Sequence, residues 1–290
     1  MKQPIFTGVA TALVTPFRDG AVDFAVFEQL LDAQLAAGID ALVVCGTTGE
    51  ASTLTMQEQM TLIAHAIQYT AGRCKIIAGT GSNSTAHALE LSRAAAAMGA
   101  DGLLLVTPYY NKCTQEGLLA HYCKIADAVS CPLIVYSVPG RTGVDLSAET
   151  CVRLSRHPNI NGIKEAGGST AKAARILREC GGDFFLWSGN DDQTVPLISL
   201  GAKGVISVLS NVRPRETMAM THAALDGDYE TAGRMQCALM PLIDALFCEV
   251  NPIPVKRALE LEGFPVGAPR LPLTPLSDRS LPRLVDALSA

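Results

Sequence analysis

The chain has 290 residues, of which 48% are hydrophobic and 18% are charged, so it can bury a large core. Its formal net charge of -5 argues against a nucleic-acid surface, and no run of lysine and arginine is long enough to bind a membrane. We therefore expect a small-molecule substrate, with no nucleic-acid or membrane partner.

Short β-rich runs alternate with helical patterns as far as about residue 225, which is typical of β/α units and a parallel sheet. Segments between the runs, such as 24–38 and 85–99, have helical apolar spacing and end in glycine. We expect eight strands, at 8–17, 40–46, 75–81, 102–108, 133–139, 160–166, 184–189 and 204–210. Eight parallel units that close on themselves form an α/β fold of the (β/α)8 TIM-barrel type. An open doubly wound sheet is the alternative, which the lack of GxGxxG after the first strand weakens.

The alternation of strands and helices stops after DGDYE at 226–230. The segments 231–247 and 251–263 have helical patterns, so we expect a catalytic barrel over 1–225 and a helical extension over 226–290. No linker rich in Pro, Gly or Ser separates the two parts. This predicts that the extension packs against the barrel.

The cysteines and histidines give no metal or disulfide pattern. The nine cysteines include no CxxC pair, which favours reduced thiols. The five histidines show neither HxxxH nor HExxH spacing, so we expect no protein-bound catalytic metal. The N-terminal stretch has no long apolar segment, and no apolar run reaches about 18 residues, so we expect a cytoplasmic protein.

Lys164 lies within the apolar run INGIKEA. Burying an ammonium without a partner is costly, and its usual consequence is a lowered pKa or a head group that reaches solvent. Among the eight lysines, Lys164 stands at the carboxyl end of an expected strand, where barrel active sites lie. Lys124 and Lys172 fall in helical segments, where we expect them to be solvated. The alternative is that Lys164 forms a structural ion pair with Glu165. Because side chains alternate along a strand, however, Glu165 should point away from Lys164.

Other expected strands end in groups that suit an amine nucleophile. Thr47 and Thr48, in a glycine-flanked turn, offer hydroxyls and backbone N–H groups to a carboxylate, or they form only a tight turn. Tyr136 is a phenol that can transfer protons, or a core tyrosine. Arg141 can bind a carboxylate with two hydrogen bonds if it faces inward, and is a surface charge if it does not.

The motifs GTTGE, AGTG, VTPYYN, YSVPGRTG, GIKEA, SGND, GVISV and NPIPVK, in this order, closely resemble those of the 4-hydroxy-tetrahydrodipicolinate synthases, also called dihydrodipicolinate synthases. The likeness covers nearly the whole chain. It implies a lyase of the class I aldolase type that condenses pyruvate with L-aspartate 4-semialdehyde on the route to diaminopimelate and lysine, with no cofactor. By this resemblance, Lys164 forms the Schiff base with pyruvate.

The resemblance also implies the remaining site residues. Tyr136, Thr48 and Tyr110 would form a proton relay, with Tyr110 reaching in from a neighbouring subunit of a homo-oligomer, a dimer of dimers. Arg141 would bind the carboxylate of the semialdehyde, and the turn of Thr47 and Thr48 that of pyruvate. Two further residues, Ile206 and Gly189, would line the substrate site.

Some positions depart from the family pattern. Ser137 stands where asparagine is common, and Gly140 where serine or alanine is common; neither change removes a chemical role. Met56, Gln59 and His87 stand where histidine, histidine and glutamate are usual in members inhibited by lysine. Loss of the glutamate removes the carboxylate expected to pair with the effector's ammonium. We therefore expect weak or absent inhibition by L-lysine.

Three other functions are compatible with parts of the pattern. A sister aldolase, such as an N-acetylneuraminate or keto-deoxy-sugar lyase, would keep Lys164 and Tyr136, but Arg141 argues against it. A pyruvate-binding regulator would need no proton relay. The hypothesis of a phosphate-binding barrel that uses residues 78–85 is weak, because phosphate sites in such barrels usually follow the seventh and eighth strands.

Overall fold

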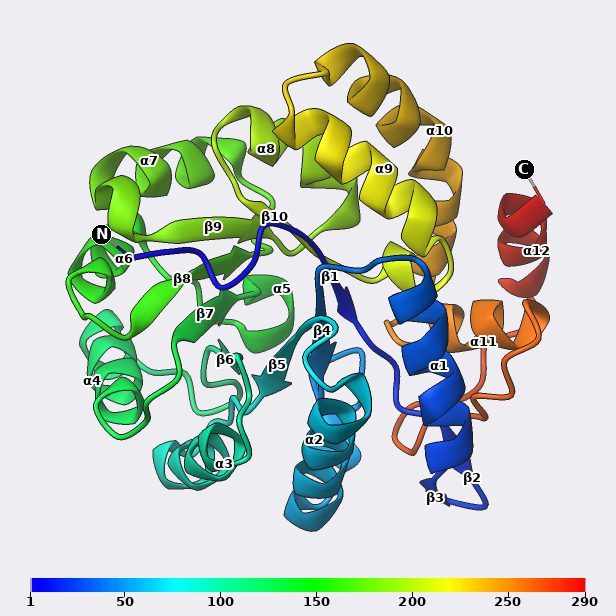
Figure 1. Cartoon of the computed structure of the whole chain (residues 1–290), viewed down its shortest axis with the longest axis horizontal. Helices are drawn as coiled ribbons and strands as arrows, with labels where there is room; N and C mark the ends of the chain where they lie inside the picture. Colours follow the sequence, from blue (N-terminus) through cyan, green and yellow to red (C-terminus); the bar gives the residue numbers. More distant parts are fainter. Residues whose placement is uncertain (1, 290) are drawn as a thin grey trace.

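Eight parallel strands form a closed barrel in the computed structural model, which describes residues 2–289 (Figure 1). The strands are β1 (Gly8–Ala12), β4 (Ala41–Val44), β5 (Lys75–Gly79), β6 (Gly102–Val106), β7 (Leu133–Ser137), β8 (Ile160–Glu165), β9 (Phe185–Ser188) and β10 (Gly204–Ser207). The barrel closes because β1 pairs with both β4 and β10. The expected TIM barrel is therefore confirmed, and the open sheet is excluded.

Helices surround the barrel and connect its strands (Figure 1). They are α1 (Phe24–Ala36), α2 (Met56–Thr70), α3 (Thr85–Ala97), α4 (Gln115–Ala126), α6 (Ala148–Ser155), α7 (Thr170–Cys180), α8 (Thr194–Ser199) and α9 (Pro214–Leu225). The short α5 (Pro139–Thr142) follows β7 directly, and four 3-10 turns are η1 (Ala51–Thr53), η2 (Gly181–Asp183), η3 (Asp191–Gln193) and η4 (Leu209–Asn211). Several helices begin where a serine or threonine caps the first turn, as Ser169 does for α7.

Side chains alternate between the inside of the barrel and its helix-facing side. The inner set forms one apolar cluster that includes Ala10, Val43, Ile77, Leu104, Ile134, Trp187 and Ile206. Phe6, which precedes β1, stacks on Trp187 with ring centroids 5.2 Å apart. The barrel interior is thus a packed core and not a pore.

The chain continues past the barrel helices as α10 (Tyr229–Leu246), α11 (Ile253–Leu261) and α12 (Leu281–Ser289). Helix α10 packs along α9, and α12 contacts both α10 and α11 (Figure 1). Within residues 2–289, no helix combines the length and apolarity needed to cross a membrane. All nine cysteines are free, and these residues contain no group of three or more His, Cys, Asp or Glu side chains placed to hold a metal ion.

The expected first strand, 8–17, is too long: β1 ends at Ala12, and Phe17 pairs outside the barrel. There β2 (Phe17–Arg18) and β3 (Ala21–Val22) form a two-stranded antiparallel hairpin. Pro16, which has no N–H to donate to a neighbouring strand, lies between the end of β1 and this hairpin. The Asp19-Gly20 pair then turns the chain with positive φ angles of 50° and 79°, as tight hairpins require.

Candidate active site

Lys164 and Tyr136 are partners in the parallel register of β8 and β7. Both side chains are buried at the carboxyl ends of their strands, and each residue is 6% exposed. The Lys164 Nζ lies 4.3 Å from the centroid of the Tyr136 ring. The structure thus places an amine directly over a phenol at the barrel mouth.

The pKa of Lys164 is lowered to about 7, mainly by burial; the carboxylate of Asp191 opposes this shift, and the positive charge of Arg141 contributes to it. Glu165 does not pair with Lys164, because its carboxylate contacts Lys172 on the other side of the strand. A lysine with a pKa near neutrality is partly unprotonated at pH 7 and can act as a nucleophile.

Burial raises the pKa of Tyr136 to about 12, although Arg141 and a hydrogen bond with Thr47 act in the opposite direction. The phenol therefore keeps its proton at neutral pH. It can donate that proton to a developing oxyanion or alkoxide and take it back, which is the behaviour of a general acid and base.

A cavity of about 350 Å³ lies beside this pair. Thr47, Tyr136 and Arg141 line it together, so the structure brings three of the expected residues to one space. The cavity also extends to Gln59 and His87. Lys164 lies against the ring of Tyr136 and does not itself form part of the cavity wall.

The turn with Thr47 and Thr48 is held from two directions. Within the turn, the Glu50 N–H donates to the Thr47 carbonyl at 3.1 Å, and Glu50 itself has a positive φ of 57°. From the C-terminal part of the chain, Lys256 Nζ forms a buried ion pair with Glu50 Oε1 at 2.8 Å. The turn is therefore held by contacts within the chain itself.

Asn251, a residue without an expected role, connects two of the expected site residues. Its side-chain Nδ2 donates to Thr48 Oγ1 at 3.0 Å, and its carbonyl oxygen accepts from Arg141 Nη2 at 3.3 Å. The only signal in the sequence was the motif NPIPVK, which begins at this residue.

Of the two further expected residues, Gly189 directly follows β9, the strand that pairs with β8, and lies close to the lysine. A Cβ atom at Gly189 would lie 3.1 Å from Lys164 Cε and 2.7 Å from the Ala166 Cβ, so a side chain there would crowd the lysine. Ile206 lies in β10 within the inner apolar cluster.

Tyr110 lies apart from the other expected residues. It is 92% exposed and has a φ of 70°, a backbone conformation that is uncommon outside glycine. The loop after β6 therefore presents this phenol to the outside of the chain rather than to its own cavity.

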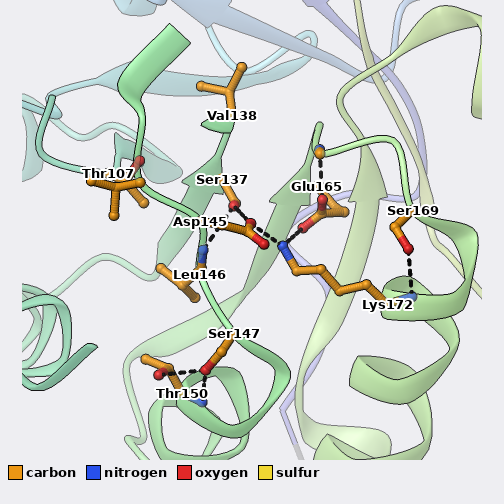
Figure 2. Close-up of polar contacts among 12 residues, drawn as sticks. Thr107, Ser137, Val138, Asp145, Leu146, Ser147, Thr150, Glu165, Ser169 and Lys172 are labelled. Carbon is orange, nitrogen blue, oxygen red and sulfur yellow. Dashed lines mark hydrogen bonds and ion pairs between the residues drawn. The ribbon is translucent and has the colours of Figure 1, made fainter. Parts of the chain in front are cut away.

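The expectation that Lys172 is solvated is wrong. Its side chain is 15% exposed and ion-pairs with both Asp145 and Glu165 (Figure 2). The reason is that Lys172 lies in the first turn of α7, which faces the carboxyl end of β8, so the side chain covers the buried Glu165 carboxylate. Lys124, by contrast, is exposed as expected.

A closed (β/α)8 barrel with a buried lysine of lowered pKa and a protonated tyrosine at its mouth defines the class of Schiff-base barrel enzymes to which class I aldolases belong. The chain belongs to the Dihydrodipicolinate synthetase family, whose profile matches residues 5–290.

Individual relatives agree with this assignment. A 4-hydroxy-tetrahydrodipicolinate synthase from Exiguobacterium sibiricum is 53% identical over 285 residues, covering 98% of this chain and 97% of that protein. The chloride-inhibited dihydrodipicolinate synthase from Acinetobacter baumannii, complexed with pyruvate, has a TM-score of 0.95 at 46% identity and 98% coverage of both chains. The synthase from Cyanidioschyzon merolae with lysine bound has a TM-score of 0.96 at 45% identity, covering 99% of this chain and 98% of that one.

Proposed function

We propose that this enzyme condenses pyruvate with L-aspartate 4-semialdehyde to give 4-hydroxy-tetrahydrodipicolinate, in the synthesis of diaminopimelate and lysine. Full-length similarity to synthases of this name supports the reaction. The structural observation that supports it best is Lys164, a buried lysine without an ion pair to Glu165, with a pKa of about 7, against the ring of Tyr136.

The reaction begins when the Lys164 amine attacks the keto carbon of pyruvate and water leaves, which gives an imine. The protonated imine withdraws electrons from the neighbouring methyl group, so a methyl proton leaves and an enamine forms. The enamine carbon then attacks the aldehyde carbon of the semialdehyde, and the aldehyde oxygen takes up a proton. Finally the amine of the semialdehyde attacks the imine carbon, closes the ring and releases Lys164.

Each of these steps moves a proton, and we assign those transfers to Tyr136, Thr48 and Tyr110. The raised pKa of Tyr136 and its position against Lys164 support its role. The outward position of Tyr110 fits a contribution to a neighbouring subunit, so the proposal includes a homo-oligomer, a dimer of dimers.

Two groups bind the substrate carboxylates in this proposal. Arg141 takes the carboxylate of the semialdehyde, since a guanidinium suits a planar anion and this one lines the cavity beside Tyr136. The turn of Thr47 and Thr48 takes that of pyruvate, with Ile206 and Gly189 as walls. The covalent imine replaces a cofactor, and none is part of the proposal.

We further propose that the chain divides into a catalytic barrel over residues 1–225 and a C-terminal extension over 226–290. The end of α9 at Leu225 and the start of α10 at Tyr229 support this boundary. The contacts of Asn251 and Lys256 with the turn at Thr48 and Glu50 indicate that the extension also stabilises the active site.

A steady-state assay tests the proposed function. Pyruvate is supplied with aspartate semialdehyde and, separately, with a panel of sugar-derived aldehydes. We expect efficient turnover with the semialdehyde and at least about a hundredfold lower kcat/KM with the sugar aldehydes, because a site that pairs a substrate charge rejects analogues lacking it. Preference for a sugar aldehyde would instead indicate a sister lyase.

A further inference from the structure

Four polar residues form a connected set on the helix-facing side of the barrel mouth, which we call the outer polar cluster: Ser137, Asp145, Glu165 and Lys172 (Figure 2). Ser137 Oγ donates to Asp145 Oδ1 at 3.0 Å. Lys172 Nζ donates to the same Asp145 oxygen and lies 3.0 Å from Glu165 Oε2. The cluster therefore runs from the end of β7 to the end of β8 through the first turn of α7.

The cluster lies directly behind the catalytic pair of the proposed reaction. Ser137 follows Tyr136, Glu165 follows Lys164, and the register pairs Ser137 with Glu165 just as it pairs Tyr136 with Lys164. Because side chains alternate along a strand, the catalytic pair points into the barrel and the cluster points outward. A shift of either strand end on the outside thus moves Tyr136 or Lys164 on the inside.

Glu165 is the buried charge of the cluster, since it is 2% exposed. Its Oε1 accepts from the Gly167 N–H at 2.7 Å, and Lys172 from α7 is the cation in contact with its Oε2. Asp145, in the loop after α5, is the other charged group that faces it. Burial raises the pKa of Glu165 and Lys172 opposes that rise, so loss of Lys172 would raise the pKa of this carboxyl group further.

Resting on the proposed function, we propose that Lys172 is a positioning residue for the reaction: by holding Asp145 and Glu165 together, it fixes the strand ends that present Tyr136 and Lys164. A displacement of about 1 Å in a catalytic group can reduce the rate about a hundredfold. A lysine that served only the stability of α7 would leave the kinetic constants of the folded enzyme unchanged.

The test compares Lys172→Met with Lys172→Arg, the double variant Glu165→Gln/Lys172→Met, and the control Lys124→Met, which changes an exposed lysine in α4. We expect Lys172→Met to lower kcat between about tenfold and a hundredfold, with KM for pyruvate changed less than about threefold. Lys172→Arg keeps the cation and the bridge, so it should recover most of kcat. The double variant removes the uncompensated carboxylate but still lacks the bridge to Asp145, so it should recover only part of kcat. Lys124→Met should match the wild type.

The pH dependence gives a second readout. In Lys172→Met, protonation of the unpaired Glu165 relieves the buried charge, so the deficit in kcat relative to the wild type should shrink as the pH falls. A normal kcat in Lys172→Met, a Lys172→Arg variant no better than Lys172→Met, or a double variant as active as the wild type would overturn the inference. Should Lys172→Met not fold, Asp145→Asn tests the same contacts at a residue whose side chain is 51% exposed. It should lower kcat severalfold, and a normal kcat there would also contradict the inference.

The controls separate this inference from the proposed function. If the wild-type enzyme forms no borohydride-reducible adduct with pyruvate at Lys164, the proposed function is wrong. If it forms that adduct and Lys172→Met turns over at the wild-type rate with an unchanged pH profile, the function stands and only the positioning role of Lys172 is wrong.

Discussion

At the scale of single residues, burial gives Lys164 and Tyr136 their complementary chemistry. The same dry environment disfavours the ammonium of the lysine and the phenolate of the tyrosine, so at neutral pH one is available as an amine and the other as an acid. Two groups whose pKa values are moved apart in this way can perform attack and protonation at the same pH.

Removing the phenol oxygen of Tyr136 should affect proton transfer more than binding. We expect Tyr136→Phe to lower kcat by roughly 10²- to 10⁴-fold, the usual contribution of a general acid or base, while the imine with pyruvate still forms. Stopped-flow or steady-state kinetics measures kcat, and trapping of the imine shows whether it still forms. Near-normal turnover would make Tyr136 a core residue only.

The pKa of Lys164 predicts how imine formation depends on pH. Since the free amine is the attacking species, the rate at which pyruvate is trapped should rise as the pH increases through about 7 and then level off. Borohydride trapping at short times over a range of pH measures this. A midpoint near the ordinary lysine value of about 10.4 would contradict the lowered pKa.

The Arg141 guanidinium is expected to act on one substrate. Arg141→Ala should raise KM for the semialdehyde well above its wild-type value and change KM for pyruvate little, because its proposed contact is the semialdehyde carboxylate. Steady-state kinetics with each substrate varied in turn measures the difference. Equal losses for both substrates would indicate collapse of the loop after β7 instead.

At the scale of elements, the segment between α10 and α11 supplies the residue that donates a hydrogen bond to the Thr48 hydroxyl. The Asn251 amide donates to Thr48 Oγ1, so the Thr48 hydroxyl is left to donate its own proton elsewhere, as a relay requires. The same residue holds Arg141 through its carbonyl oxygen.

Reversing that hydrogen bond is a direct test of its direction. Asn251→Asp presents an ionised carboxylate that accepts the Thr48 proton, so kcat should fall about a hundredfold and further than in Asn251→Ala. The loss should lessen at low pH, where the protonated acid can donate again. Kinetics of both variants over a range of pH measure this, and an Asp variant as active as the wild type would mean that Thr48 is the donor.

Local patterns in the sequence predicted the barrel and the direction of Lys164 because strand periodicity is a local property. The end of β1 was misplaced, since Pro16 and the Asp19-Gly20 turn redirect the chain into a hairpin. The burial of Lys172 and the contact of Asn251 with Thr48, 203 residues away in the sequence, depend on how distant elements pack. Such long-range contacts leave no periodic signal.

At the scale of the whole molecule, one feature concerns contact between copies of the chain, and a second concerns the binding of a small effector. Tyr110 projects from the chain, and its proposed catalytic role requires a neighbouring subunit. The cavity beside Tyr136 extends to Gln59 and His87, where the sequence departs from lysine-inhibited members of the family.

We expect the enzyme to be insensitive, or nearly so, to millimolar L-lysine. Loss of a partner for a buried charge costs about 3–5 kcal/mol, which at about 1.4 kcal/mol per decade weakens binding at least a hundredfold. The Gln59 amide nitrogen is already engaged in a hydrogen bond, because its Nε2 donates to the Ala51 carbonyl at 2.9 Å. An inhibition titration decides this: half-inhibition below about one millimolar, non-competitive with pyruvate, would show that another acid such as Glu90 binds the effector.

The proposed covalent role of Lys164 is tested most directly by one measurement. The folded enzyme is incubated with saturating pyruvate and borohydride, digested and mapped by mass spectrometry. An imine is reducible and a salt-bridged ammonium is not, so we expect one reduced pyruvate adduct, on the peptide that contains Lys164, and none in Lys164→Ala. An adduct on a different lysine, or no adduct at all, would contradict the account.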